Sequence, residues 1–222
     1  MYAAIVFLPI IGSIIAGLFG RVIGARASEI VTTGLLFVSA ALSIVAFNDV
    51  ALQGHHTITQ IMPWIHSGDF AVDWTVRIDT ITAVMLVVVT GVSSLVHLYS
   101  IGYMADDPHR PRFFSFLSLF TFAMLMLVTA NNFLQLFFGW EGVGLASYLL
   151  IGFWYTRPSA NAAAIKAFIV NRVGDFGFAL GIFAVWMLTG SVMYDEIFAK
   201  ASELAQMRLV FLGMDLNALT IT

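Results

Sequence analysis

The chain has 222 residues, of which 60% are hydrophobic and 10% are charged, with a mean hydropathy of +0.93. This composition excludes an ordinary soluble domain and indicates an integral membrane protein in contact with lipid. The net charge is −3 and the sequence contains no run of basic residues, which argues against nucleic acid as a partner. The chain has no cysteine, which excludes disulfides and cysteine-held iron–sulfur clusters within it.

Long apolar runs predict membrane-spanning helices, because a helix satisfies its own backbone in lipid and a β-barrel would show short alternating segments. We expect an all-α polytopic bundle, a single membrane domain over 1–222 with about six to seven spans. The spans are placed near 2–20, 30–47, 80–103, 113–129, 133–154 and 162–188. The first lacks the basic start of a signal peptide, so we expect it to be retained.

A polar outer loop at 48–77 separates the second span from the third. Its segments HTITQIMPWI and DFAVDWTVRI are rich in β-branched and aromatic residues and flank His-Ser-Gly, which predicts a small β-hairpin on the membrane surface. No patterned ligand set accompanies its histidines, so solvated side chains are favoured over a metal site. The polar side chains of the loop include His55, His56, His66, Asp69 and Asp73.

The last thirty residues predict an interfacial helix near 192–208, where apolar residues are spaced among charges. A further apolar run starts after Met207 and stops at Thr222 without a polar tail, so we expect the chain to be a fragment of a longer protein. Alternation of the spans puts one group of basic residues at the cytoplasm or matrix: arginines 21, 26, 110, 112 and 157. Arg77, Lys200 and Arg208 then lie on the other side.

Glu141 lies in the fifth predicted span, about eight residues or ~12 Å from its start. A charge at the bilayer centre costs about 2.5–3.5 kcal/mol, and such residues mark ion or proton pathways by default. Gly139, Gly142 and Gly144 surround it, and small residues let a neighbouring helix bring a partner close. Glu141 is either a proton-exchanging carboxylate facing a cation or half of a static ion pair that locks two helices.

The sixth predicted span carries Lys166, Arg172 and Asp175. Lys166 lies about four residues inside, so it either snorkels to the nearer surface or relays protons. Arg172 and Asp175 are three residues apart and can pair on one helix face. Arg172 is interpreted as a fixed positive charge, and Asp175 as its static partner or as a carboxylate that exchanges partners.

Other polar residues inside the spans leave two interpretations open. His97 is a lone histidine in the third span, and it is either a hydrogen-bonded packing residue or a proton relay. Tyr148, Ser147 and Asn171 either hold water for a proton wire or join helices by hydrogen bonds.

Two segments carry a family resemblance: FFGWEGVGLASYLLIGFWY and SANAAAIKAFIVNRVGDFGF, with similar upstream segments from about residue 62. They resemble the largest antiporter-like subunit of respiratory complex I, subunit L in bacteria and subunit 5 in mitochondria. The resemblance implies about fourteen core helices in inverted repeats, of which this chain supplies roughly the first third. It also implies that Glu141 is the family's membrane glutamate, Lys166 a lysine on the following helix, and Arg172 with Asp175 the NRVGD ion pair.

The resemblance further implies proton pumping coupled to NADH oxidation by quinone, in the bacterial or mitochondrial inner membrane. NAD, FMN, iron–sulfur clusters and quinone belong to partner subunits, and no cofactor, metal or redox chemistry is expected in this chain. Its partners are other complex I subunits, especially the neighbouring antiporter-like subunit. The family's central lysine, the glutamate's partner, falls after Thr222. Two alternatives stay open: the large subunit of a multisubunit sodium/proton antiporter, and a structural helix bundle that docks a neighbour.

Overall fold

The computed structural model describes residues 1–68, 70–211 and 214–218, so Asp69 and Thr222 lie outside the described residues. Six described helices are long and apolar enough to cross a membrane, which confirms the all-α membrane fold. They are α1 (Tyr2–Ile23), α2 (Ala25–Phe47), α3 (Thr80–Tyr103), α4 (Arg110–Val128), α5 (Phe133–Ile151) and α6 (Pro158–Thr189). A π-helical turn, η1 (Asn48–Leu52), extends α2.

The predicted hairpin is confirmed as the antiparallel pair β1 (Thr57–Ser67) and β2 (Phe70–Ile78). One face of β2, with Val72, Val76 and Ile78, is buried against the helices. On α5, Gln135 makes a two-point contact with the backbone of Thr75, accepting from its N–H at 3.1 Å and donating to its carbonyl at 2.6 Å. The side-chain amide thus satisfies part of the free edge of β2, as a paired strand would.

Three helices begin earlier than the sequence indicated: α2, α6 and, by three residues, α4. Gly24 has φ +84°, a conformation that suits glycine, so the chain reverses at one residue and α2 starts at Ala25 rather than near 30. Pro158 occupies the first turn of α6, where its missing N–H costs nothing and its fixed φ suits a helix. As a result Glu29 lies inside α2, and Lys166 lies eight residues into α6 rather than four.

The segment near 192–208 differs from the single interfacial helix expected. It forms α7 (Tyr194–Ala199) and α8 (Ala201–Leu204), separated at Lys200, an exposed residue whose ammonium donates to the Thr189 carbonyl at 2.5 Å. Two short strands follow, β3 (Arg208–Phe211) and β4 (Met214–Asn217), with Arg208 paired to Asp215 at 3.0 Å.

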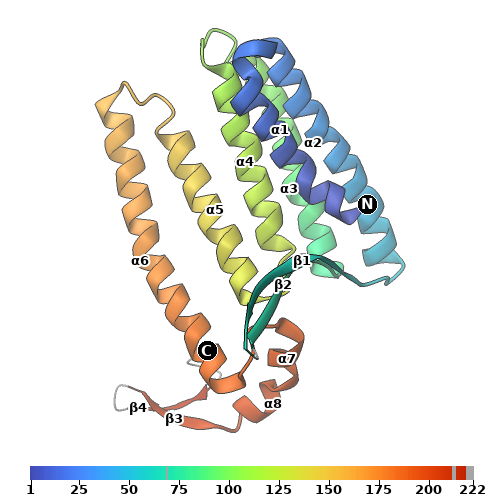
Figure 1. Cartoon of the computed structure of the whole chain (residues 1–222), viewed down its shortest axis with the longest axis vertical. Coiled ribbons are helices and arrows are strands. Elements are labelled where there is room, and N and C mark those ends of the chain that lie inside the picture. Colours follow the sequence, from blue (N-terminus) through green and yellow to red (C-terminus); the bar gives the residue numbers. More distant parts are fainter. Residues whose placement is uncertain (69, 212–213, 219–222) are drawn as a thin grey trace.

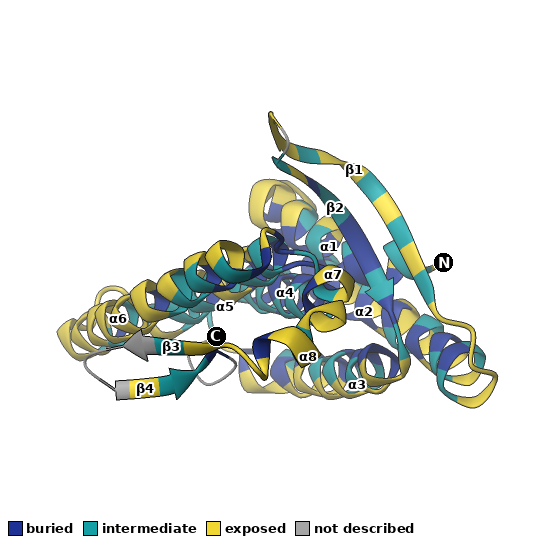
Figure 2. Ribbon diagram, turned by 90° about the horizontal axis from the view of Figure 1, so that it is seen from below, coloured by how far each residue is buried: buried dark blue, intermediate teal, exposed yellow. Residues whose placement is uncertain are grey.

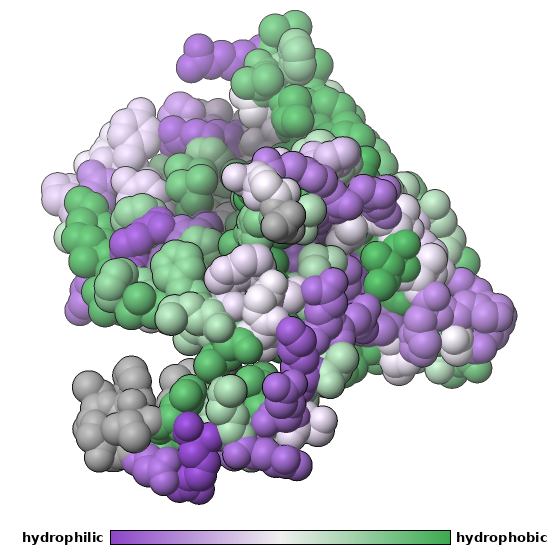
Figure 3. Space-filling view, turned by 60° about the horizontal axis from the view of Figure 1, so that its bottom comes forward, coloured by the Kyte–Doolittle hydropathy of each residue, from purple (hydrophilic) through white to green (hydrophobic). Residues whose placement is uncertain are grey.

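Helices α1 to α4 form a bundle, α5 packs on α4, and α6 packs on α5 at the edge (Figure 1). Figure 2 shows buried residues on the inner sides of the bundle and exposed ones over much of α6. The α1–α2, α3–α4 and α5–α6 links share one end, whereas the hairpin and the α7–β4 segment lie at the other. Hydrophilic residues gather at this second end, the hairpin end (Figure 3).

Candidate ion-pair site between two membrane helices

Three of the predicted site residues meet between α5 and α6. Arg172 Nη1 lies 2.5 Å from Glu141 Oε2 and 3.6 Å from Asp175 Oδ2. Arg172 therefore pairs across the helix interface more closely than with Asp175, the partner that spacing along one helix suggested. Glu141 lies near the middle of α5, and Arg172 and Asp175 lie near the middle of α6. The cluster of two carboxylates and one guanidinium is thus at mid-height of the bundle.

Trp140 is a fourth member of this cluster that the sequence reasoning missed. Its indole Nε1–H donates to Asp175 Oδ1 at 2.7 Å, and its ring lies 5.7 Å from that of Phe178. Asp175 is 8% exposed, so the carboxylate is held from two sides, by the indole and by Arg172. The sequence did offer a signal for this contact, since Trp140 directly precedes Glu141 inside a predicted span. A tryptophan N–H in an apolar region needs a hydrogen-bond acceptor, and a carboxylate on a neighbouring helix can provide one.

One oxygen of Glu141 has unused capacity. Oε2 accepts from Arg172, whereas Oε1 is buried and has no hydrogen-bond partner among the described residues. A carboxylate offers about four lone-pair sites, so Glu141 can accept a further donor or carry a proton at Oε1 without breaking its contact with Arg172.

Two of the three glycines around Glu141, Gly139 and Gly142, face a different helix from the one that supplies its partner. A Cβ at Gly139 would lie 2.6 Å from the backbone N of Leu127, and one at Gly142 would lie 3.0 Å from Ala123 Cβ. Both contacts are on α4. The close approach therefore seats α5 on α4, while Arg172 reaches Glu141 with its long side chain from α6.

Lys166 is not brought to this cluster. It is exposed on α6 and makes no ion pair within the part of the chain that the structure describes. Six residues separate it from Arg172, a rotation of about 240° around the helix, so the two side chains leave α6 in different directions. Of the other polar candidates, Asn171 lies near Gly144, and the ring of Tyr148 packs on Phe168 at 5.4 Å.

His97 lies in a separate polar cluster between α3 and α4, fully buried. Its Nδ1 lies 2.8 Å from the Ser93 carbonyl, and its Nε2 lies 3.0 Å from Ser118 Oγ. A carbonyl only accepts, so Nδ1 carries the proton, and a neutral ring accepts from the Ser118 hydroxyl at Nε2. Both nitrogens are occupied, but only the contact of Nε2 with Ser118 crosses from α3 to α4, since Ser93 is on α3 itself. Ser93 adds a second contact between the helices, with Thr121 at 2.5 Å.

A second buried ion pair was missed because the second span was placed too late in the sequence. Glu29 Oε1 lies 3.0 Å from Arg110 Nη1, and the Glu29 side chain is 5% exposed. This contact joins α2 to the start of α4. Arg110 is one of the five arginines that alternation of the spans places at that end of the bundle, and its charge is balanced by Glu29.

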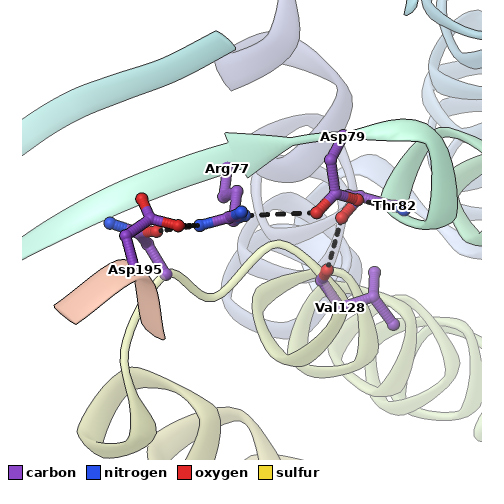
Figure 4. Close-up of polar contacts among 6 residues, drawn as sticks. Arg77, Asp79, Thr82, Val128 and Asp195 are labelled. Atoms are coloured by element: carbon purple, nitrogen blue, oxygen red, sulfur yellow. Dashed lines mark hydrogen bonds and ion pairs between the residues drawn. The ribbon is translucent and has the colours of Figure 1, made fainter. Parts of the chain in front are cut away.

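At the hairpin end, Arg77 links three elements (Figure 4). It contacts Asp195 at 2.7 Å, Asp79 at 3.2 Å and Asn131 at 3.0 Å, which ties β2 to α7 and to the α4–α5 link. Asp79 also accepts from Thr82 N at 2.9 Å and so caps α3. Burial alone would raise the pKa of Asp79, but the Thr82 donors and Arg77 hold it below its usual value.

The loop histidines pair separately, His55 with Asp49 at 2.9 Å and His66 with Asp73 at 3.0 Å. Within the described ranges, no three histidine, aspartate or glutamate side chains gather in a way that could hold a metal.

Two family descriptions match the chain: "NADH-Ubiquinone oxidoreductase (complex I), chain 5 N-terminus" over residues 64–114, and "NADH:quinone oxidoreductase/Mrp antiporter, TM" over residues 130–221. NADH-ubiquinone oxidoreductase chain 5 of Triticum aestivum is 56% identical over 100% of this chain and 33% of its own length. NADH-quinone oxidoreductase subunit L of Rhodobacter capsulatus is 54% identical over 98% of this chain and 31% of its own length. The chain spans about a third of these curated relatives.

Two solved structures have the same fold. The membrane-bound sulfane sulfur reductase, an archaeal respiratory membrane complex, gives a TM-score of 0.73 at 20% identity over 90% of this chain and 30% of the matched chain. The Mrp complex from Dietzia sp. gives 0.74 at 21% identity over 88% of this chain and 20% of the matched chain. At these identities the likeness shows the fold alone, and it confirms the antiporter-like helix bundle.

Proposed function

Since this chain belongs to the chain 5 and subunit L family of NADH:quinone oxidoreductase, we propose that it forms the N-terminal part of a proton-translocating membrane-arm subunit of complex I. The membrane would be a bacterial or mitochondrial inner membrane. The other subunits of the complex, including the neighbouring antiporter-like subunit, would be its partners. They would hold NAD, FMN, the iron–sulfur clusters and quinone, while this chain would move protons.

One observation carries the proposal: Arg172 lies between two membrane carboxylates, 2.5 Å from Glu141 and 3.6 Å from Asp175. A guanidinium stays charged throughout, so the proton must move on the carboxylates. When Arg172 is on Glu141, that carboxylate is stabilised as the anion. When Arg172 moves to Asp175, Glu141 is left without its cation in a poorly hydrated region, where the neutral acid is favoured.

In this proposal Glu141 accepts a proton as Arg172 leaves and releases it as Arg172 returns. Oε1, which is buried and lacks a described partner, is the oxygen that would carry the proton. Lys166 would feed or receive protons from the cytoplasmic or matrix side. Because it does not contact the ion pair, water molecules or residues outside this chain would have to carry the proton between them. His97, in its own cluster, would serve a relay only through its Ser118 hydroxyl contact.

The test is Glu141→Gln in the intact complex. The neutral amide cannot exchange a proton, so proton pumping per electron should fall while the complex still assembles. Normal pumping in an assembled complex would contradict the proposal. Loss of assembly with normal turnover in the remaining complex would favour a structural docking role.

A multisubunit sodium/proton antiporter is a second candidate, because the matched family description over residues 130–221 covers Mrp antiporters as well. The two differ in their partners. Co-purification of the full-length protein with flavin and iron–sulfur proteins would support complex I, whereas sodium-dependent proton transport without them would support the antiporter.

A further inference from the structure

Two cavities of about 440 and 450 Å³ meet at Arg112 on α4, at the end of the bundle opposite the hairpin. Arg112 and Tyr155 line both. The first cavity lies between α4, α5 and α6, and the second between the end of α1, the start of α2 and the start of α4. On α5 and α6 the nearest lining residues, Tyr148 and Ile165, are each seven residues from Glu141 and Arg172, and neither that cluster nor Lys166 lines the cavities.

Arg112 is held in place but leaves most of its hydrogen-bonding capacity unused. Its guanidinium lies over the rings of Phe153 at 4.8 Å and Tyr155 at 5.0 Å, and Nη2 donates to the Phe153 carbonyl at 2.8 Å. Nε is buried without a hydrogen-bond partner, and no described carboxylate lies within 4.0 Å of the group. Asp107 acts on it only at longer range.

Positive charge is in excess around Arg112. Arg21 and His109 line the second cavity, and within the described chain Arg21 has no ion-pair partner. Glu29 is paired with Arg110, so its charge does not compensate Arg112 or Arg21. Asp107 accepts from the Trp154 indole at 3.0 Å and keeps its charge, but it acts on Arg112 only at longer range. The cavity thus presents two guanidinium groups to whatever enters, and an anion is the matching ligand.

The remainder of the lining is apolar. Phe116, Leu149 and Ile165 line the first cavity. On α1, beside Arg21, Leu18 is 74% exposed and Val22 is 86% exposed. A ligand here meets guanidinium donors at one end and the exposed apolar surface of α1 at the other. Phospholipids combine these two properties, whereas a free phosphate ion would use only the donors.

We propose that Arg112 and Arg21 bind the phosphate group of an anionic phospholipid, whose acyl chains lie along the apolar surface of α1 and in the cavity between α4 and α6. The planar guanidinium of Arg112, fixed by two rings and a carbonyl, provides the directional contact, and Arg21 adds charge from α1. The lipid would add to the contacts of Arg112 with Phe153 in joining the α1–α4 bundle to the α5–α6 pair at this end.

The test uses the full-length subunit in its purified complex, with Arg112→Gln, Arg21→Gln and a matched control, Arg157→Gln. Arg157 lies at the same end, over the ring of Trp154 at 5.0 Å, but lines neither cavity. Native mass spectrometry after delipidation would measure rebinding of phosphatidylglycerol against phosphatidylcholine. Losing a charge-assisted contact should weaken phosphatidylglycerol binding about tenfold or more in the first two variants and little in the control.

Equal binding by wild type and Arg112→Gln would overturn the proposal, as would an equal loss in Arg157→Gln, which would show general charge attraction. Inorganic phosphate provides a further arm. Displacement of phosphatidylglycerol by millimolar phosphate would show that a free anion is the ligand and would also overturn the proposal. If Arg112→Gln fails to assemble, Arg21→Gln on the separate helix α1 decides the result.

Discussion

Replacing Trp140 by phenylalanine removes the indole N–H that donates to Asp175 at 2.7 Å, while an aromatic ring stays beside Phe178. A hydrogen bond to a charged acceptor contributes about 1.5–3 kcal/mol. Asp175 is 8% exposed, so water replaces little of that contact. The carboxylate should instead turn to Arg172, now 3.6 Å away, and draw it from Glu141. At 1.4 kcal/mol per decade, the pairing preference should shift by about 10- to 150-fold.

Proton pumping per electron, measured with NADH:quinone turnover in vesicles containing the intact complex, should fall in Trp140→Phe. The decisive measurement is a double-mutant cycle with Asp175→Asn, since a residue that acts through Asp175 has no further effect once that carboxylate is absent. Trp154→Phe is the matched control, because its indole donates to Asp107 at 3.0 Å outside the site.

The reasoning would be refuted by additive effects of Trp140→Phe and Asp175→Asn, which would show that Trp140 acts through packing alone. An equal loss of pumping in Trp154→Phe would refute it too, because that change removes an indole–carboxylate contact without touching Arg172.

Three further predictions concern charge, pH and packing. Arg172→Gln leaves the buried Asp175 and the partly buried Glu141 without a cation. Removing one partner of a fully buried pair costs about 3–5 kcal/mol, which is an upper bound here, so the amount of assembled complex should drop more than in Arg172→Lys. Equal amounts would contradict this. Asp79 has a pKa below its usual 3.8, so its stabilisation is present above that value and lost as pH falls through the lower folded-state pKa. Thermal denaturation should therefore separate wild type from Asp79→Asn at pH 7, and the difference should shrink below pH 3.8; a constant difference would argue against a charge effect. Gly139→Ala places a Cβ 2.6 Å from the α4 backbone and should destabilise the protein by about 1–3 kcal/mol, whereas Gly144→Ala, with 4.0 Å to its nearest atom, should be tolerated in the same assay.

The spans and the hairpin could be predicted because their signals are local. A long apolar run has few alternatives to a helix in lipid, and two β-branched segments around a tight turn specify a hairpin. The boundaries were less predictable. The start of α2 depended on the single positive φ at Gly24, and five residues of error there hid the ion pair between Glu29 and Arg110.

The pairing of Arg172 with Glu141 could not be predicted from the sequence for a different reason. Spacing along one helix shows that Arg172 can reach Asp175, but the rotation of α5 against α6 decides that Arg172 reaches Glu141 first. The glycines beside Glu141 indicated a close helix neighbour without identifying it, and for Gly139 and Gly142 that neighbour is α4. Contacts between helices depend on side-chain shape over the whole interface, which no short motif encodes.

The contact of Gln135 with the edge of β2 has a mechanical consequence. Its two hydrogen bonds to Thr75 pin α5 to the hairpin six residues, about 9 Å, before Glu141. A helix pinned near one end moves as a lever about that point. A small tilt of α5 would barely displace the hairpin end, would move Glu141 by an intermediate amount, and would move the α5–α6 link most. The distance between Glu141 and Arg172 would then depend on a pivot at the hairpin end of α5.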